Sequence, residues 1–265
     1  MPVIGCSCPR CTSKNEKDTR FRTSAYIQGR DGTSIVIDTG PEFRMQALKW
    51  RITKLDAVLL THTHADHLHG LDDVRIFSHN CSRVQNDATM RPSLKVYANT
   101  PSIEEVKERF SYIFKPTQEG GGKPRLDLIP TEEYTASHPL KIGSITIIPI
   151  PMKHGDLDTN GYLMEEDGLR IAYLTDCSCI PDSSIDLVKH CDHAVIDGLR
   201  VRPHTTHLNF DQAVEYASKI GAGKTWITHI CHDFLHTDIN AYLAQKSGNS
   251  FFIEAAYDGL ILQKE

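Results

Sequence analysis

Residues 57–67 read Ala57-Val58-Leu59-Leu60-Thr61-His62-Thr63-His64-Ala65-Asp66-His67. The four apolar residues are typical of a buried strand, and three imidazoles and one carboxylate follow within six positions. His62 and His64 share one face of an extended segment because strand side chains alternate, and a strand-to-helix turn would redirect Asp66 and His67. The H-x-H-x-D-H spacing therefore predicts ligands for divalent metal, divided between two ions.

The composition is that of an ordinary globular protein. The chain has 265 residues, enough for one sizeable domain, and its net charge of -5 argues against a broad electrostatic surface for nucleic acid. No apolar run approaches the length of a membrane span, and residues 1–5 lack the basic-then-apolar character of a signal peptide. We therefore expect one cytoplasmic domain over residues 1–265, without membrane or nucleic-acid partners.

Hydrophobic periodicity predicts an early hairpin and, later, strands that alternate with helices. The predicted strands are 25–29, 34–38, 57–60, 94–98, 145–150, 162–165, 169–174, 193–197, 224–228 and 257–262. The predicted helices are 43–50, 101–110, 182–190, 210–220 and 238–245, with loops at 80–92 and 119–124. This mixture predicts an α+β fold in which two sheets lie between layers of helices.

Three further polar residues stand just past apolar runs: His154, Asp176 and His229. Taken singly, each is more commonly a loop or turn residue than a ligand. Ligand sites gather at strand ends in open α/β sheets, so their repetition favours one shared site.

The pattern resembles the metallo-β-lactamase superfamily, and within it the phosphoribosyl 1,2-cyclic phosphate phosphodiesterases. The likeness covers nearly the whole chain and includes residues 5–11, 62–71, 175–176 and 228–232. It implies a four-layer αββα sandwich that binds two divalent ions, manganese, zinc or iron. By position it implies that His62, His64 and His154 hold one ion, that Asp66, His67 and His229 hold the other, and that Asp176 bridges both.

The resemblance also implies roles for residues around the metals. His207 would act as general acid or orient the substrate phosphate, and Asp66 would take part in catalysis as well as in metal binding. Asp38 would orient a ligand histidine, although a role in an N-cap or turn is about as common for such a residue. Arg75 is a candidate for binding substrate phosphate, with Arg200 and Arg202 as further candidates; surface ion pairing is the commoner role for each alone.

Residues 6–11 form a cysteine knuckle, Cys6-x-Cys8-x-x-Cys11. Three thiolates leave a tetrahedral zinc ion one ligand short. The resemblance supplies His232, three residues after His229, with Cys231 as a weaker candidate; three unligated thiols are the alternative. A structural zinc here would tie the N-terminal segment to the loop that carries His229. The family usually has a strand before this knuckle, whereas this sequence starts at Met1. Either that strand is absent or the given start is late, which leaves the sheet edge and part of the substrate rim open and does not affect the metal ligands.

The predicted function is hydrolysis of small cyclic phosphate esters by a hydroxide held between two metal ions. The substrates that the resemblance suggests are phosphoribosyl 1,2-cyclic phosphate and 2′,3′-cyclic nucleotides. A tRNase Z-like ribonuclease or another dimetal hydrolase of this fold is the first alternative, but neither the charge nor an insertion supplies a basic RNA-binding arm. A non-enzymatic zinc-binding protein is the second. The sequence leaves both a monomer and a homodimer open.

Overall fold

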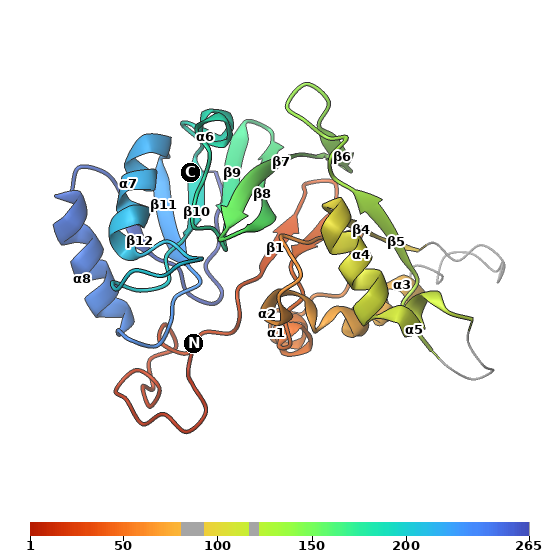
Figure 1. Cartoon of the computed structure of the whole chain (residues 1–265), viewed down its shortest axis with the longest axis horizontal. Helices are drawn as coiled ribbons and strands as arrows, with labels where there is room; N and C mark the ends of the chain where they lie inside the picture. Colours follow the sequence, from red (N-terminus) through yellow and green to blue (C-terminus); the bar gives the residue numbers. More distant parts are fainter. Residues whose placement is uncertain (81–92, 117–121, 265) are drawn as a thin grey trace. The chain divides into compact units, whose positions relative to one another are not determined.

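The computed structural model describes residues 1–80, 93–116 and 122–264, which form two compact units (Figure 1). One unit comprises residues 22–145, and the other comprises residues 1–21 and 146–265. Most of the loops predicted at 80–92 and 119–124 lies outside the described residues. The sequence predicts a single domain over residues 1–265. The division into two compact units does not test this, so the single domain stays a prediction.

The 22–145 unit is built on a five-stranded sheet of order β1-β2-β3-β4-β5. Its strands are β1 (Ala25–Gln28), β2 (Ser34–Ile37), β3 (Ala57–Leu59), β4 (Leu94–Ala98) and β5 (Leu126–Pro130). Strands β1 and β2 are antiparallel, which confirms the predicted hairpin, and the other pairs are parallel. Because Ile37 pairs with Leu59, β2 and β3 end side by side, and the residues after them meet at one edge of the sheet.

Helices in this unit are short, and several follow directly from strand ends. They are α1 (Phe43–Lys49), α2 (Ala65–Leu68), α3 (Arg75–Asn80), α4 (Thr100–Arg109) and α5 (Ser111–Phe114), with a 3₁₀ turn at Leu71–Val74. The Asn99 side chain accepts from the Ser102 N–H and so caps the start of α4. Phe43, Val74 and Ile103 belong to the same buried cluster as Val58 and Val96 of the sheet. This packing holds the ends of β2 and β3 in a rigid frame.

The second sheet has the order β12-β11-β10-β9-β8-β7-β6. Its strands are β6 (Leu140–Ile142), β7 (Ile145–His154), β8 (Leu157–Glu166), β9 (Leu169–Leu174), β10 (His193–Asp197), β11 (Lys224–Thr228) and β12 (Ile253–Ala255). The pairs β7–β8 and β8–β9 are antiparallel, whereas β9 to β12 run parallel. The parallel strands end at one edge, which therefore receives Asp176, Asp197 and His229.

Three helices accompany this sheet: α6 (Asp182–Val188), α7 (Phe210–Ile220) and α8 (His236–Ser247) (Figure 1). Helix α7 begins with a capping box between Asn209 and Gln212 and ends at Gly221, whose φ of 60° suits a residue without a side chain. Its buried residues, Phe210, Ala213, Ala217 and Ile220, belong to the apolar core with the sheet. The sequence predicted this helix with the same bounds.

The strand predicted at 257–262 is wrong, because the last strand is β12 (Ile253–Ala255). Beyond it the Leu260 N–H donates to the Tyr257 carbonyl at 3.1 Å, and Gly259 has a φ of 88°. These features make a turn, and Ile261 is 78% exposed. The apolar residues of 257–262 have the spacing of a strand, but they are half-buried or exposed and pair with no strand in the described part of the chain.

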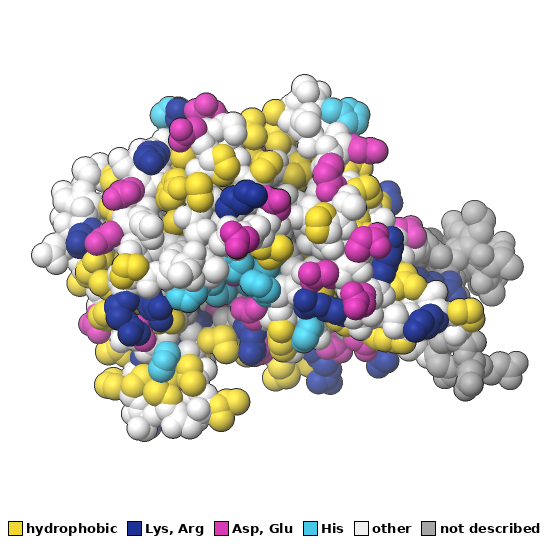
Figure 2. Space-filling model, in the orientation of Figure 1, with side chains coloured by type: hydrophobic (Ala, Val, Ile, Leu, Met, Phe, Trp, Pro, Cys, Tyr) yellow, Lys and Arg dark blue, Asp and Glu magenta, His cyan; other side chains and the backbone are white. Residues whose placement is uncertain are grey.

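No helix within the described ranges is long and apolar enough to cross a membrane. Acidic and basic side chains are interspersed over the face shown in Figure 2, in keeping with the small net charge of -5.

Candidate metal-binding and active site

The histidine cluster that follows β3 lies at the start of α2. The carbonyl of His64 accepts from the N–H groups of His67 and Leu68, at 3.0 and 3.1 Å, so the helix begins directly after His64 and redirects the residues that follow. The ring centroid of His62 lies 4.6 Å from that of His64 and 4.5 Å from that of His67. Asp66 Oδ2 lies 3.7 Å from His67 Nε2. Thus one unit brings together four of the predicted ligands.

Asp38 supports this cluster from the end of β2. Its side chain is fully buried and accepts from the Thr61 N–H and O–H, both at 2.8 Å, while its Oδ2 lies 2.7 Å from His67 Nδ1. Burial raises the pKa of Asp38, and the adjacent His67 opposes that shift. The residue also has a φ of 60°, a conformation that costs of order 1–3 kcal/mol in a residue with a side chain. Asp38 therefore turns the chain and also fixes the His67 ring.

Two glycines let the segment after β2 contact the ligand loop closely. The Thr39 N–H donates to the His67 carbonyl at 2.7 Å, and the Gly70 N–H donates to the Thr39 carbonyl at 2.8 Å. A Cβ at Gly40 would lie 2.2 Å from the Asp66 carbonyl oxygen, and one at Gly70 would lie 2.1 Å from the Gly40 oxygen. Any side chain at these positions would push the ligand loop away from Asp38.

Helix α4 contacts the same loop through two residues that the sequence analysis did not identify. Glu105 accepts from the Thr63 hydroxyl, and Arg109 donates to the Thr63 carbonyl at 2.6 Å. Arg109 also donates to Glu105 at 2.8 Å, an i,i+4 pair that can be read from the helix pattern. Thr63 lies between His62 and His64, so this contact fixes the backbone that sets their spacing.

The other unit positions His154, Asp176 and His229 at strand ends. His154 ends β7 before the two-residue turn Gly155-Asp156, and its Nδ1 lies 2.6 Å from the Thr206 carbonyl oxygen. Asp176 and His229 have φ values of 56° and 57°, left-handed conformations that are rare for residues with side chains. His229 Nε2 lies 3.3 Å from Asp176 Oδ1. Strained residues of this kind cluster at functional sites.

His207 lies among these residues and contacts a buried carboxylate. Its ring stacks on that of His229 at 4.6 Å, with an interplanar angle of 14°, and its centroid is 4.5 Å from that of His154. His207 Nδ1 lies 3.1 Å from Asp197 Oδ2, which also accepts from the Leu208 N–H at 2.9 Å. Burial raises the pKa of Asp197, and His207 opposes the shift. Asp197 was not predicted from the sequence. The signal was present, because Asp197 is the last residue of an apolar strand, and Asp38 and Asp176 stand at or near the ends of similar strands.

The arginines proposed for substrate phosphate are placed as follows. Arg75 is exposed at the start of α3, close enough to Tyr112 for its charge to act on that phenol. Arg202 makes an exposed ion pair with Asp233 at 3.3 Å, and the half-buried Arg200 donates to the Pro203 carbonyl at 3.5 Å. Their roles in substrate binding stay predictions.

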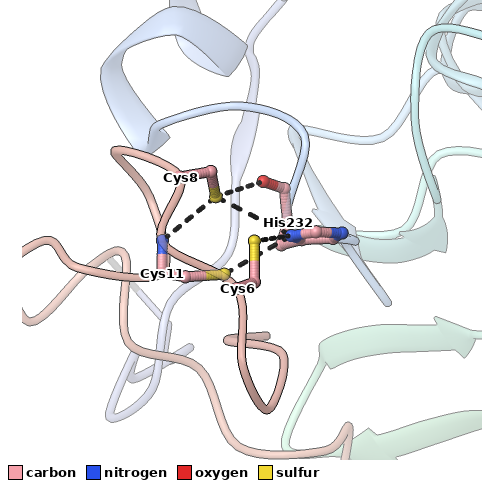
Figure 3. A group of neighbouring side chains, drawn as sticks. All are labelled: Cys6, Cys8, Cys11 and His232. Atoms are coloured by element: carbon pink, nitrogen blue, oxygen red, sulfur yellow. Dashed lines mark hydrogen bonds between the residues drawn. The ribbon is translucent and has the colours of Figure 1, made fainter.

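The cysteine knuckle and His232 lie together in one unit (Figure 3). The Sγ atoms of Cys6, Cys8 and Cys11 lie 3.5, 3.8 and 3.4 Å from His232 Nδ1. Hydrogen bonds from the Cys11 N–H and from His232 lower the pKa of Cys8 to about 6, which favours its thiolate. Three thiols and one imidazole are a donor set typical of structural zinc. Burial raises the pKa of the neighbouring Cys231, which makes it a poorer ligand.

A substitution at Asp38 tests whether it orients His67. Asp38→Asn is expected to weaken divalent-metal binding about 10–100-fold, because the partners of metal-ligating histidines carry effects of that size. The measurement is calorimetric titration of the metal-free protein with Mn²⁺ or Zn²⁺. The matched control is Asp56→Asn in the same unit, since Asp56 accepts from the Ser34 N–H rather than from a ligand histidine. Equal metal affinities for the two variants would contradict the role of Asp38.

Comparison with known protein families identifies the superfamily of this chain. Residues 33–230 match the beta-lactamase superfamily domain. The chain belongs to this superfamily. A solved structure described as a new diphosphatase from the PhnP family is 36% identical, with a TM-score of 0.81, and the match covers 98% of this chain and 90% of that one. The chain is therefore a PhnP-like metallo-β-lactamase protein, and the predicted α+β fold is confirmed.

Two other relatives of this metallo-β-lactamase protein show how broadly the fold is shared. A protein named octanoyltransferase from Porphyromonas gingivalis (strain ATCC BAA-308 / W83) is 34% identical over 262 residues, which are 98% of this chain and 48% of that protein. The chain thus spans about half the length of that relative. Zn²⁺-bound PqqB from Methylobacterium extorquens is 16% identical, with a TM-score of 0.72, and the match covers 99% of this chain and 95% of that one. This second likeness is one of fold.

The donor chemistry fits the divalent metals that the metallo-β-lactamase fold implies. Each unit presents imidazole and carboxylate groups together, a combination that suits zinc, manganese or iron. The number of ions and the sharing of ligands between the two units stay predictions.

Proposed function

We propose that this protein hydrolyses a small cyclic phosphate ester, such as phosphoribosyl 1,2-cyclic phosphate or a 2′,3′-cyclic nucleotide. The observation that carries the proposal is the His207–Asp197 pair. In this pair His207 is the proton donor. The buried carboxylate of Asp197 holds its ring, which also stacks on the predicted metal ligand His229. The 36% identity to a PhnP-family diphosphatase supports hydrolysis at phosphorus, the reaction class to which this proposal belongs.

The proposed site uses seven ligands for two divalent ions. His62, His64 and His154 would hold one ion, Asp66, His67 and His229 the other, and Asp176 would bridge them. Ions bound there would activate a water molecule for attack and neutralise charge on a phosphoryl oxygen. We further propose a structural zinc on Cys6, Cys8, Cys11 and His232, which would fasten residues 1–21 to the loop that carries His229.

His207 would protonate the leaving oxygen. Because Nδ1 faces Asp197, the carboxylate fixes the ring orientation and leaves Nε2 to donate. Opening a cyclic ester releases an alkoxide, a strong base that needs this proton. General acids of this kind contribute about 10²–10⁴-fold to the rate.

A diphosphate linkage is the second candidate, because the PhnP-family relative is described as a diphosphatase. The attack on phosphorus would be the same, but the leaving group would be a phosphate. A phosphate is a weaker base than an alkoxide, so its departure depends less on a proton donor. The two candidates therefore differ in how strongly they require His207.

The test compares turnover of four substrates: phosphoribosyl 1,2-cyclic phosphate, 2′,3′-cyclic AMP, a nucleoside diphosphate and an octanoyl thioester. Each is assayed with added Mn²⁺ or Zn²⁺ for the wild type, His207→Ala and His204→Ala. His204 is the matched control, because it is exposed and its ring centroid lies 5.1 Å from that of His207. We expect turnover of a cyclic ester that falls about 10²–10⁴-fold in His207→Ala alone.

Other outcomes would assign the chain differently. Turnover of the diphosphate with little dependence on His207 would favour the second candidate. Hydrolysis of the octanoyl thioester alone, or no turnover by folded, metal-loaded protein, would contradict the proposal.

A further inference from the structure

Arg10 lies in the cysteine knuckle, between Cys8 and Cys11, and is 2% exposed. Its three guanidinium nitrogens are buried, and none of them forms a hydrogen bond with the described residues. A buried charge is strongly destabilising unless an opposite charge compensates it. The position of Arg10 therefore requires a source of negative charge nearby.

The groups that can offset the charge of Arg10 when ionised are the thiols of Cys8, Cys11 and Cys231 and the carboxyl of Asp18. Asp18 already accepts from the Ser13 hydroxyl at 2.6 Å and from the His236 N–H at 2.7 Å. It also acts on the second buried arginine, Arg20. Cys231 also acts on Arg20, so Cys8 and Cys11 of the knuckle are the compensating groups that remain for Arg10.

Arg20 is a second buried arginine of the same segment, and unlike Arg10 it has polar contacts. Its Nη2 lies 3.1 Å from His236 Nδ1, and its Nε donates to the Ala256 carbonyl at 3.4 Å. Asp18, Asp258 and Cys231 are the groups of opposite charge that act on it, and Arg10 acts on it as a like charge. The two arginines thus share Asp18 and Cys231, but Arg20 has hydrogen-bond partners and Arg10 has Cys8 and Cys11 beside it.

A metal ion bound at the knuckle would fix a negative counter-charge beside Arg10. A divalent ion bound to Cys6, Cys8, Cys11 and neutral His232 would hold all three sulfurs as thiolates and leave the site with one net negative charge. The guanidinium carries one positive charge that protonation equilibria do not remove. We propose that Arg10 is the counter-ion of the metal-loaded knuckle and increases its affinity for metal. The inference rests on the proposed structural metal but not on the proposed hydrolysis.

Cobalt(II) gives a readout specific to this site. Among the ligand sets proposed here, only the knuckle contains thiolates, so a sulfur-to-cobalt charge-transfer band reports on it and not on the histidine cluster. The metal-free full-length protein is titrated with Co²⁺, and bound Co²⁺ is then displaced with Zn²⁺ to obtain both affinities. Arg10→Met removes the charge and keeps an apolar chain, whereas Arg10→Lys keeps the charge.

We expect Arg10→Met to weaken metal binding at the knuckle about 10–100-fold, a typical effect for groups that contact metal ligands. Arg10→Lys should recover most of the affinity, and the control Arg20→Met should not lower it. Equal affinities for Arg10→Met and the wild type, or no recovery in Arg10→Lys, would overturn the inference. If Arg10→Met does not fold, Arg10→Gln replaces it in the same comparison.

A second measurement uses stability. Arg10→Met should lower the Tm less in zinc-stripped protein than in zinc-loaded protein. Without zinc, neither the wild type nor the variant holds the three metal-bound thiolates that Arg10 would neutralise. An equal loss in the two states would overturn the inference, as would a wild type without a charge-transfer band. The hydrolysis proposal would survive either result, because it does not use the cysteines.

Discussion

Asp176→Asn is expected to abolish most of the hydrolytic activity. A bound metal ion supplies several kcal/mol of charge stabilisation in a transition state, and losing ~4 kcal/mol lowers kcat/KM about 1000-fold. Asp176 is 1% exposed, and its Oδ1 lies 3.3 Å from His229 Nε2. Asparagine tolerates the left-handed conformation that Asp176 adopts at a φ of 56°. The substitution therefore removes a charge and preserves the backbone.

The control for Asp176→Asn is Asp167→Asn. Asp167 also has a left-handed backbone, with a φ of 49°, but it is exposed in the turn between β8 and β9. The measurements are kcat/KM for the preferred phosphate ester and metal content by elemental analysis. We expect Asp167→Asn to behave as the wild type and Asp176→Asn to bind less metal. Wild-type kcat/KM in Asp176→Asn would rule out a bridging role.

Cys8→Ser is expected to have the largest effect on stability. Residues 1–21 contain no helix or strand, so the knuckle is a main attachment of this segment to its unit. A ligand present at 1000 times its Kd stabilises the folded state by ~4 kcal/mol, which corresponds to a fall in Tm of ~8–16 °C when binding is lost. The pKa of the Cys8 thiol is lowered to about 6, which favours the thiolate form that binds metal.

Calorimetry with and without a chelator measures this effect. The wild type should lose stability when the chelator is added, whereas Cys8→Ser should start lower and respond less. Cys179→Ser is the matched control, since Cys179 is an exposed thiol of the same unit. A Cys8→Ser protein as stable as Cys179→Ser would show that the knuckle is not a structural metal site.

Much of the local structure followed from the sequence. The strands 94–98, 169–174, 193–197 and 224–228 and the helix 210–220 have the predicted bounds. Each combines a clear apolar period with flanking turn or cap residues, so local preference and burial agree. The strand at 257–262 failed because its apolar residues have no sheet to bury them, which the pattern cannot reveal.

The ligand types could also be read from the sequence, because His62, His64, Asp66 and His67 are neighbours in the chain. The partners that hold such ligands could not. Glu105 contacts Thr63 at a sequence separation of 42 residues, and Asp197 contacts His207 at a separation of 10. The sequence by itself therefore determined most of the longer strands and helices, the histidine motif and the donor chemistry, but not elements such as β5, β6 and β12. Only the tertiary structure decided that Asp197, Glu105 and the Thr206 carbonyl also orient donors, because such contacts depend on packing between segments that have no periodic relation along the chain.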